Sequence, residues 1–100
     1  ALYHVPILID GFISSVAALT AVKLCPTVKD YLLPSHMSKE PARLKLIEYL
    51  GLDPFIKCNM CLGEGTGTVA VMPILEMAAA VYNNMSTFSE INVEEYKPLN

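Results

Sequence analysis

A short and uninterrupted apolar run near the start of the chain, residues 5–9 (Val-Pro-Ile-Leu-Ile), constrains the fold more than any other feature. A strand that is apolar at every position is buried on both faces, which is typical of a parallel sheet covered by helices. Pro6 fits only near the start or the edge of such a strand. Asp10 and Gly11 end the run. The chain is therefore expected to be an α/β protein with parallel strands.

The remaining patterns predict several helices but only one further strand. Ser14 or Ser15 is a candidate cap for the first helix, Ser38 for a later one, and Gly51 occupies the position that follows a helix C-terminus. We expect helices at residues 15–24, 39–50, 55–60 and 66–84, a strand at 31–33, a polar loop at 35–38, and short helical turns at 27–31 and after 86 or 87. Two short parallel strands do not form a stable sheet alone, so further strands must come from elsewhere.

Composition leads to the same expectation. A chain of 100 residues buries only a modest core, yet 53% of these residues are apolar and the mean hydropathy is +0.41. Apolar surface beyond what one core can hide implies burial against another chain or a missing segment. We therefore interpret residues 1–100 as a piece of a larger protein, buried against a missing segment or in a homo-oligomer, with residues 94–100 as a frayed tail.

Charge and hydropathy exclude two classes of partner. The net charge is −3 with only seven Lys and Arg, which argues against nucleic acid because phosphate neutralisation needs a basic surface. The apolar run at residues 68–82 contains Pro73 and Glu76 and is shorter than the roughly 20 residues of a membrane span. Neither nucleic acid nor a membrane is expected as partner.

The three cysteines form no disulfide framework, which suits a reducing cytoplasm. Cys58 and Cys61 do fit the C-x-x-C spacing of metal and redox sites. A zinc site needs about four ligands, and the remaining candidates, Cys25, His4 and His36, are scattered. A metal or redox module stays open as an alternative to two half-buried thiols, but no metal is expected.

The motif with the clearest chemistry is Leu-Gly-Glu-Gly-Thr-Gly at residues 62–67, which opens onto the long apolar helix. Glycines allow close approach of a ligand, and the start of a helix offers unpaired N–H groups that attract anions. Burial would raise the pKa of Glu64 while the helix start favours its ionised form, a combination suited to a general base in a cleft. A glycine turn that merely starts a helix is the alternative.

Two other segments are expected beside this turn. Ligands of open α/β sheets bind at the carboxyl ends of the strands, where Asp10 and Gly11 follow the first strand. The hydroxyls of Ser35 and Ser38 and the ring of His36 follow the second strand and can face the same crevice. An Asp-Gly pair is also a common turn, and a lone histidine is more often structural than catalytic.

Three strings together resemble one family. Val-Pro-Ile-Leu-Ile-Asp-Gly-Phe-Ile-Ser-Ser at residues 5–15, Leu-Pro-Ser-His-Met-Ser at 33–38 and Leu-Gly-Glu-Gly-Thr-Gly at 62–67 resemble the C-terminal part of nicotinate-nucleotide:dimethylbenzimidazole phosphoribosyltransferases. The resemblance implies a fragment of a Rossmann-like parallel-sheet enzyme. It also implies transfer of phosphoribose from nicotinate mononucleotide to 5,6-dimethylbenzimidazole in cobalamin synthesis, with α-ribazole 5′-phosphate and nicotinate as products and no cofactor.

The resemblance also implies roles for individual residues. Glu64 matches the proposed general base of the family, which takes the benzimidazole N–H proton as the other ring nitrogen attacks the anomeric carbon. The positions that match substrate or product contacts are Asp10, Gly11, Ser35, Ser38, Leu62, Gly63, Gly65 and Thr66.

Two departures from the family limit what this chain can do alone. Cys61 stands where the family commonly has Arg, which removes a fixed charge beside the turn. The benzimidazole pocket, a further Glu and a phosphate-contacting Lys lie upstream of the matching segment. The 100-residue chain is therefore expected to be inactive by itself, and a non-catalytic α/β assembly module remains an alternative of a different class.

Overall fold

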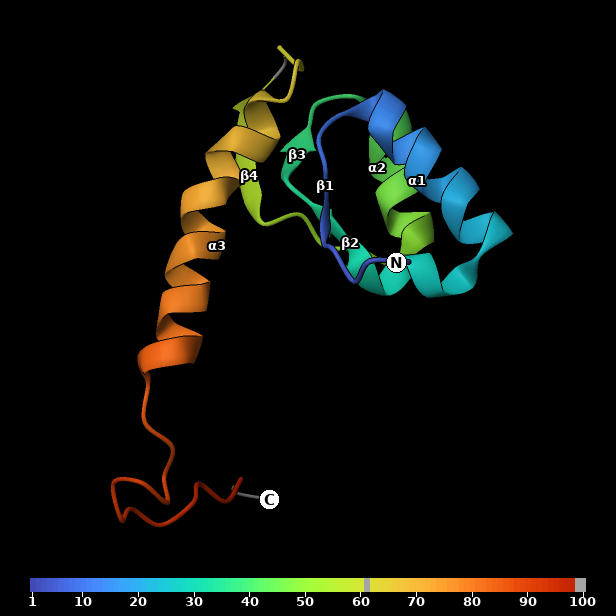
Figure 1. Cartoon of the computed structure of the whole chain (residues 1–100). Helices are drawn as coiled ribbons and strands as arrows, with labels where there is room; N and C mark the ends of the chain where they lie inside the picture. The colour runs from blue at the N-terminus through green and yellow to red at the C-terminus, as the bar shows by residue number, and fades with distance from the viewer. Residues whose placement is uncertain (61, 99–100) are drawn as a thin grey trace.

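Strands and helices alternate along most of the chain in the computed structural model, which describes residues 1–60 and 62–98 (Figure 1). The elements are β1 (Ile7–Ile9), α1 (Phe12–Leu24), the 3-10 helix η1 (Pro26–Tyr31), β2 (Leu32–Pro34), β3 (His36–Ser38), α2 (Pro41–Leu50), β4 (Ile56–Met60) and α3 (Thr66–Asn84). The expected α/β class is confirmed.

All strand pairs are parallel, as the apolar run of β1 predicts. β1 pairs with β2 and β3 pairs with β4, giving two small sheets. Ser35 joins them, because its N–H donates to the Ile9 carbonyl at 3.0 Å and its own carbonyl accepts from the Ile56 N–H at 3.2 Å. β2 and β3 thus form one extended segment, flanked by β1 on one side and β4 on the other.

Two predicted elements are wrong. The expected polar loop at 35–38 contains β3, and the expected helix at 55–60 is the strand β4. A six-residue helix is marginal without packing, whereas the extended segment offers it unpaired carbonyls. The Phe55 N–H donates to the Pro34 carbonyl at 3.2 Å, so strand pairing overrides the Asp53-Pro54 helix-start signal. The second strand also includes Pro34, where the sequence predicted its end.

The first helix begins three residues before its predicted start. Gly11 is its N-cap, so neither Ser14 nor Ser15 caps it. Instead, the Ser14 hydroxyl accepts from the Gly11 N–H at 3.0 Å and donates to the Gly11 carbonyl at 2.9 Å, while Ser15 Oγ donates to the same carbonyl at 2.8 Å. Both serines therefore stabilise the first turn from inside it.

The other helix ends follow the sequence more closely. α2 has Glu40 and not Ser38 as its N-cap, and Gly51 ends it in the left-handed conformation (φ 62°) as expected. α3 has the predicted bounds. The 3-10 helix has Cys25 as its N-cap and begins at Pro26, one residue before the predicted turn.

The segment after α3 forms turns but no helix. The Thr87 N–H donates to a Glu90 carboxylate oxygen at 2.7 Å, which closes a turn. Residues 94–98 carry no regular secondary structure and are exposed, and residues 99–100 lie outside the described part of the chain.

The core lies between the first sheet and its two covering helices. Ile9, Ala18, Leu32 and Leu50 form one buried cluster, contributed by β1, α1, β2 and α2. Partly buried side chains that pack on this cluster are Leu19, Val22, Val28 and Leu52. Burial of these apolar groups is what anchors β1, and with it Asp10 at the strand's carboxyl end.

α3 contributes little to that core and projects away from the sheets (Figure 1). Only Gly67 and Val71 of this helix are buried, while Met77 and Tyr82 remain exposed, Tyr82 to 87%. The radius of gyration is 16.7 Å, against about 13 Å for a globular domain of this length. The apolar surface expected from composition is therefore present and uncovered. Within residues 1–60 and 62–98, no helix is long and apolar enough to cross a membrane.

Truncation of a buried side chain of β1 tests this account of the core. Ile9 is 1% exposed, so Ile9→Ala should lower the free energy of unfolding by about 2–5 kcal/mol through lost transfer energy and a cavity. Leu2, 92% exposed, provides the control, and Leu2→Ala should stay within about 0.5 kcal/mol of the parent. Urea denaturation measures both, and equal effects of the two substitutions would contradict the assignment of the core.

Candidate active site

Three consecutive residues of the glycine turn adopt the left-handed conformation. Gly63, Glu64 and Gly65 have φ angles of 75°, 55° and 81°. Glycine tolerates this region, but a residue with a side chain loses roughly 1–2 kcal/mol in it. The turn that presents Glu64 is therefore unfavourable by itself and needs contacts from elsewhere to hold it.

Asp10 supplies those contacts from a position 55 residues earlier in the chain. Its carboxylate accepts the Gly65 N–H at 3.0 Å through Oδ2 and the Gly67 N–H at 3.1 Å through Oδ1. These N–H groups belong to the first turn of α3, where no intrahelical acceptor is available. Asp10 thus caps α3 from β1, and its negative charge is favoured at this helix end.

Gly67 allows the start of α3 to come this close. A Cβ atom placed on Gly67 would overlap the His36 ring and lie 2.9 Å from Asp10 Oδ1. Any side chain at position 67 would therefore push α3 away from both residues. His36 and Asp10 together form the seat on which the glycine turn rests.

Ser35 fixes the orientation of His36. The Ser35 hydroxyl donates to the Ile9 carbonyl at 2.8 Å and lies 3.0 Å from His36 Nδ1. Because the single hydroxyl hydrogen is used on Ile9, Nδ1 must carry a hydrogen and donate it to Ser35 Oγ. Both side chains are buried. Burial lowers the pKa of His36 below its ordinary value, Arg43 lowers it further, and Asp10 opposes both, which favours the neutral ring.

Arg43 is a buried cation beside this seat, and the sequence reasoning missed it. Its Nη2 donates to the Asp10 carbonyl at 2.6 Å, and its Nη1 donates to the His36 carbonyl. Desolvation lowers the pKa of Arg43, while the charges of Asp10 and Glu40 raise it. A signal was available, because Arg43, Ile47 and Leu50 share the i, i+4, i+7 spacing of the buried face of α2.

The remaining site residues from the sequence differ in their surroundings. Glu64 is exposed, and among the described residues its carboxylate has no hydrogen-bond partner. The expected shielding of Glu64 in a cleft is therefore not supplied by the residues that the structure describes. Leu62 is exposed as well, and Thr66 Oγ1 donates to the Gly63 carbonyl at 2.8 Å.

The structure thus brings some predicted site residues together and leaves others apart. Asp10 contacts the backbone of the glycine turn. Ser35 does not contact the turn directly but is hydrogen-bonded to His36, whose ring lies against Gly67. Gly11 follows Asp10 as the N-cap of α1. The backbone of Ser38 lies at the end of β3, and its side chain is outside the described part of the structure.

The two described cysteines, Cys25 and Cys58, are not part of a metal site. Cys25 and Cys58 are free and exposed, and Cys61, on which the C-x-x-C interpretation depends, lies outside the described residues. In the described part of the chain, no group of three or more His, Cys, Asp or Glu is placed to hold a metal ion.

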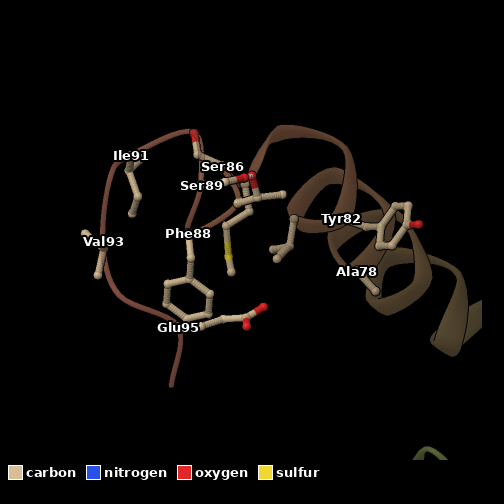
Figure 2. A pocket seen from close by; sticks show the side chains of 11 residues that line it. Ala78, Tyr82, Ser86, Phe88, Ser89, Ile91, Val93 and Glu95 are labelled. Atoms are coloured by element: carbon tan, nitrogen blue, oxygen red, sulfur yellow. Dashed lines mark hydrogen bonds between the residues drawn. The ribbon is translucent and has the colours of Figure 1, made fainter. Parts of the chain in front are cut away.

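A large apolar hollow lies at the far end of α3 (Figure 2). Its lining includes Ala78, Tyr82, Phe88, Ile91 and Val93, from the last turns of the helix and the segment that follows. The 19 residues of α3 span about 27 Å, so this hollow is remote from the glycine turn at the other helix end. It is not part of the candidate active site.

Comparison with known proteins decides the family. A family model described as phosphoribosyltransferase matches residues 1–93. The chain belongs to this phosphoribosyltransferase family. Nicotinate-nucleotide--dimethylbenzimidazole phosphoribosyltransferases from Ruminiclostridium cellulolyticum and Clostridium acetobutylicum are 46% and 48% identical to it over 99 residues. In both cases the match covers 99% of this chain and 28% of the relative, so the chain spans just over a quarter of their length.

A solved structure agrees with the sequence relatives. The crystal structure of the enzyme of the same name from Thermus thermophilus superposes with a TM-score of 0.79 at 42% identity. The superposition covers 91% of this chain and 27% of the Thermus chain. The two small sheets and their helices are therefore similar to part of a larger enzyme of this family.

Gly67→Ala tests the seat of the glycine turn. The added methyl group meets the His36 ring, so the substitution should lower the free energy of unfolding by about 1–3 kcal/mol. Gly11→Ala is the comparison, because a Cβ there meets nothing within 4 Å, and only the weaker N-cap preference of Ala should lower stability, by at most about 1 kcal/mol. Thermal unfolding measures both. His36→Ala in the Gly67→Ala background should recover part of the loss, and no recovery would contradict the proposed clash.

The buried His36 also predicts a pH dependence. Its pKa in the folded state is lowered from 6.5, so the unfolded state binds more protons between the two values. The stability that the neutral ring provides is present above about pH 6.5 and is lost as the pH falls through the folded pKa. Urea midpoints measured from pH 8 to about pH 5 should fall more steeply in the parent than in His36→Gln. Parallel curves for the two proteins would contradict this assignment.

Proposed function

We propose that this chain forms the part of a nicotinate-nucleotide:dimethylbenzimidazole phosphoribosyltransferase that carries the general base. The observation that supports this most strongly is the left-handed glycine turn, which Asp10 holds at the carboxyl end of β1 with Glu64 at its apex. The relatives that match nearly the whole chain carry the name of this enzyme. The substrates are then nicotinate mononucleotide and 5,6-dimethylbenzimidazole.

In this proposal Glu64 acts as the general base. Its carboxylate takes the proton from the benzimidazole N–H, and the other ring nitrogen attacks the anomeric carbon of the ribose. The bond from that carbon to the nicotinate nitrogen breaks with its electron pair going to nicotinate. Attack opposite the leaving group inverts the β-nucleotide to the α-configuration. The Glu64 side chain is exposed and has no partner among the described residues, which is consistent with a pocket completed by other parts of the enzyme.

The proposed substrate-binding residues fall into two groups. Leu62, Gly63, Gly65 and Thr66 belong to the turn, where the glycines let a ligand approach the backbone closely. Asp10, Gly11, Ser35 and Ser38 lie at the carboxyl ends of the strands or just after them. The Asp10 carboxylate and the Ser35 hydroxyl already hold the site together, so their contribution to substrate binding is proposed to run through the turn they support.

The partners follow from the uncovered surface. We propose that α3 packs against the remainder of the enzyme or against a second copy, because Tyr82 and much of its apolar surface are exposed in this chain. The chain alone is then inactive, and the enzyme that contains it works in the cytoplasm without metal, cofactor, nucleic acid or membrane. The same uncovered helix also favours the alternative of a non-catalytic assembly module.

A hybrid enzyme distinguishes the two functions. The segment of the Clostridium acetobutylicum relative that aligns with this chain is replaced by this chain, and the product α-ribazole 5′-phosphate is followed by chromatography. The hybrid should form product from nicotinate mononucleotide and 5,6-dimethylbenzimidazole, while the relative without the segment should not. A folded hybrid without activity would support the assembly module instead.

Glu64→Gln in the active hybrid tests the base. The amide keeps the size of the side chain but cannot accept the proton, so kcat should fall by about 10²- to 10⁴-fold. KM for nicotinate mononucleotide should change little, since the base acts on the other substrate. Glu48→Gln, at an exposed position of α2, is the control and should retain full turnover. Unchanged kcat in Glu64→Gln would refute the assignment.

A further inference from the structure

We infer that Arg43 is a positioning residue for the general base. It holds Asp10 and His36, the two residues against which Gly67 packs, and thereby determines the position of Glu64. This inference rests on the proposed function, because it concerns the geometry of the same reaction. Its starting point is that a buried guanidinium from α2 contacts both strands that meet at the glycine turn.

Arg43 acts on the backbone of both supporting residues. One guanidinium nitrogen donates to the carbonyl of Asp10 and another to the carbonyl of His36. Asp10 follows β1, and His36 begins β3, so the two bonds fix the distance between the ends of separate strands. The planar guanidinium can do this because its donors have a fixed separation and direction.

The same two residues carry the start of α3. Asp10 accepts the N–H groups of Gly65 and Gly67, and the His36 ring fills the space beside Gly67. Arg43 and Glu64 are therefore connected by direct contacts. The guanidinium binds the carbonyls of Asp10 and His36, and the side chains of these two residues contact the backbone of the turn. The hydrogen bonds of Arg43 go to the carbonyls of Asp10 and His36 and not to the turn itself, which makes it a positioning residue.

Burial of this cation argues for a role beyond packing. Arg43 is 1% exposed, and its Nε has no hydrogen-bond partner among the described residues. An apolar side chain of similar volume would avoid that unpaired donor and the desolvation of a charge. A general base works only within about 2.6–3.2 Å of the proton it removes, and a displacement of about 1 Å can cost about 100-fold in rate. By holding both Asp10 and His36, Arg43 keeps the turn, and with it the Glu64 carboxylate, within this narrow range of positions.

The active hybrid provides the test. Arg43→Lys keeps the charge but replaces two donors of fixed separation and direction with one ammonium group on a flexible stem, and Arg43→Met removes both bonds while retaining volume. Relative to the parent hybrid, kcat should fall by about 10- to 100-fold in Arg43→Lys and further in Arg43→Met, with KM for nicotinate mononucleotide within about twofold. Lys45→Met, at an exposed position of the same helix, is the matched control and should retain kcat.

A second readout follows the turn directly. Amide hydrogen exchange at Gly65 and Gly67 should become faster in both Arg43 variants, while exchange of the buried core amide of Leu50 should not change. Circular dichroism and thermal unfolding establish that each variant is folded at the assay temperature. A purely structural role would instead raise exchange throughout the core and lower activity in proportion to the folded fraction.

The outcomes separate this inference from the proposed function. An inactive parent hybrid rejects the proposed function. An active parent with unchanged kcat in Arg43→Lys and Arg43→Met overturns the positioning role, and so does a loss of kcat without faster exchange at Gly65 and Gly67. If both variants unfold, Arg43 is a stabilising residue of the fold and the inference is also overturned.

Discussion

The site depends on one interaction, the pair of hydrogen bonds from the Gly65 and Gly67 amides to the Asp10 carboxylate. It joins the first strand to the last long helix across most of the chain. The interaction is charge-assisted, and a carboxylate as acceptor at a helix start is stronger than a neutral one. It offsets the cost of a left-handed glutamate and places that glutamate at the carboxyl edge of the sheet. Without it, α3 would have few contacts with the rest of the molecule.

The other buried polar side chains near the turn support this pair of hydrogen bonds indirectly. Ser35 orients His36, His36 shapes the space for Gly67, and Arg43 connects the backbones of Asp10 and His36. None of these side chains is exposed. Buried polar groups carry a desolvation cost, so a cluster of them is stable only when nearly every donor and acceptor is used. The single unpaired Nε of Arg43 is the exception within the described residues.

The sequence predicted the elements whose signals are local. A continuous apolar run identified β1. A glycine at position 51 identified the end of α2, and the glycine turn identified the start of α3. β3 and β4 were missed because their pairing joins segments about 20 residues apart, and Asp53-Pro54 suggested a helix. In the site, the placement of Asp10 followed from the edge rule for parallel sheets. Arg43 was missed because a charged residue on a helix is ordinarily assumed to face solvent.

α3 is held to the rest of the chain by few buried residues, which lowers the free energy needed to open the site locally. Only Gly67 and Val71 of its 19 residues are buried, whereas β1, β2, α1 and α2 share the main core. Partial opening that releases this helix leaves that core intact, so it requires less free energy than global unfolding. The glycine turn therefore opens at a lower free energy than the main core does. Anything that covers the helix, whether the rest of the enzyme or a second subunit, would raise the population of assembled sites by mass action.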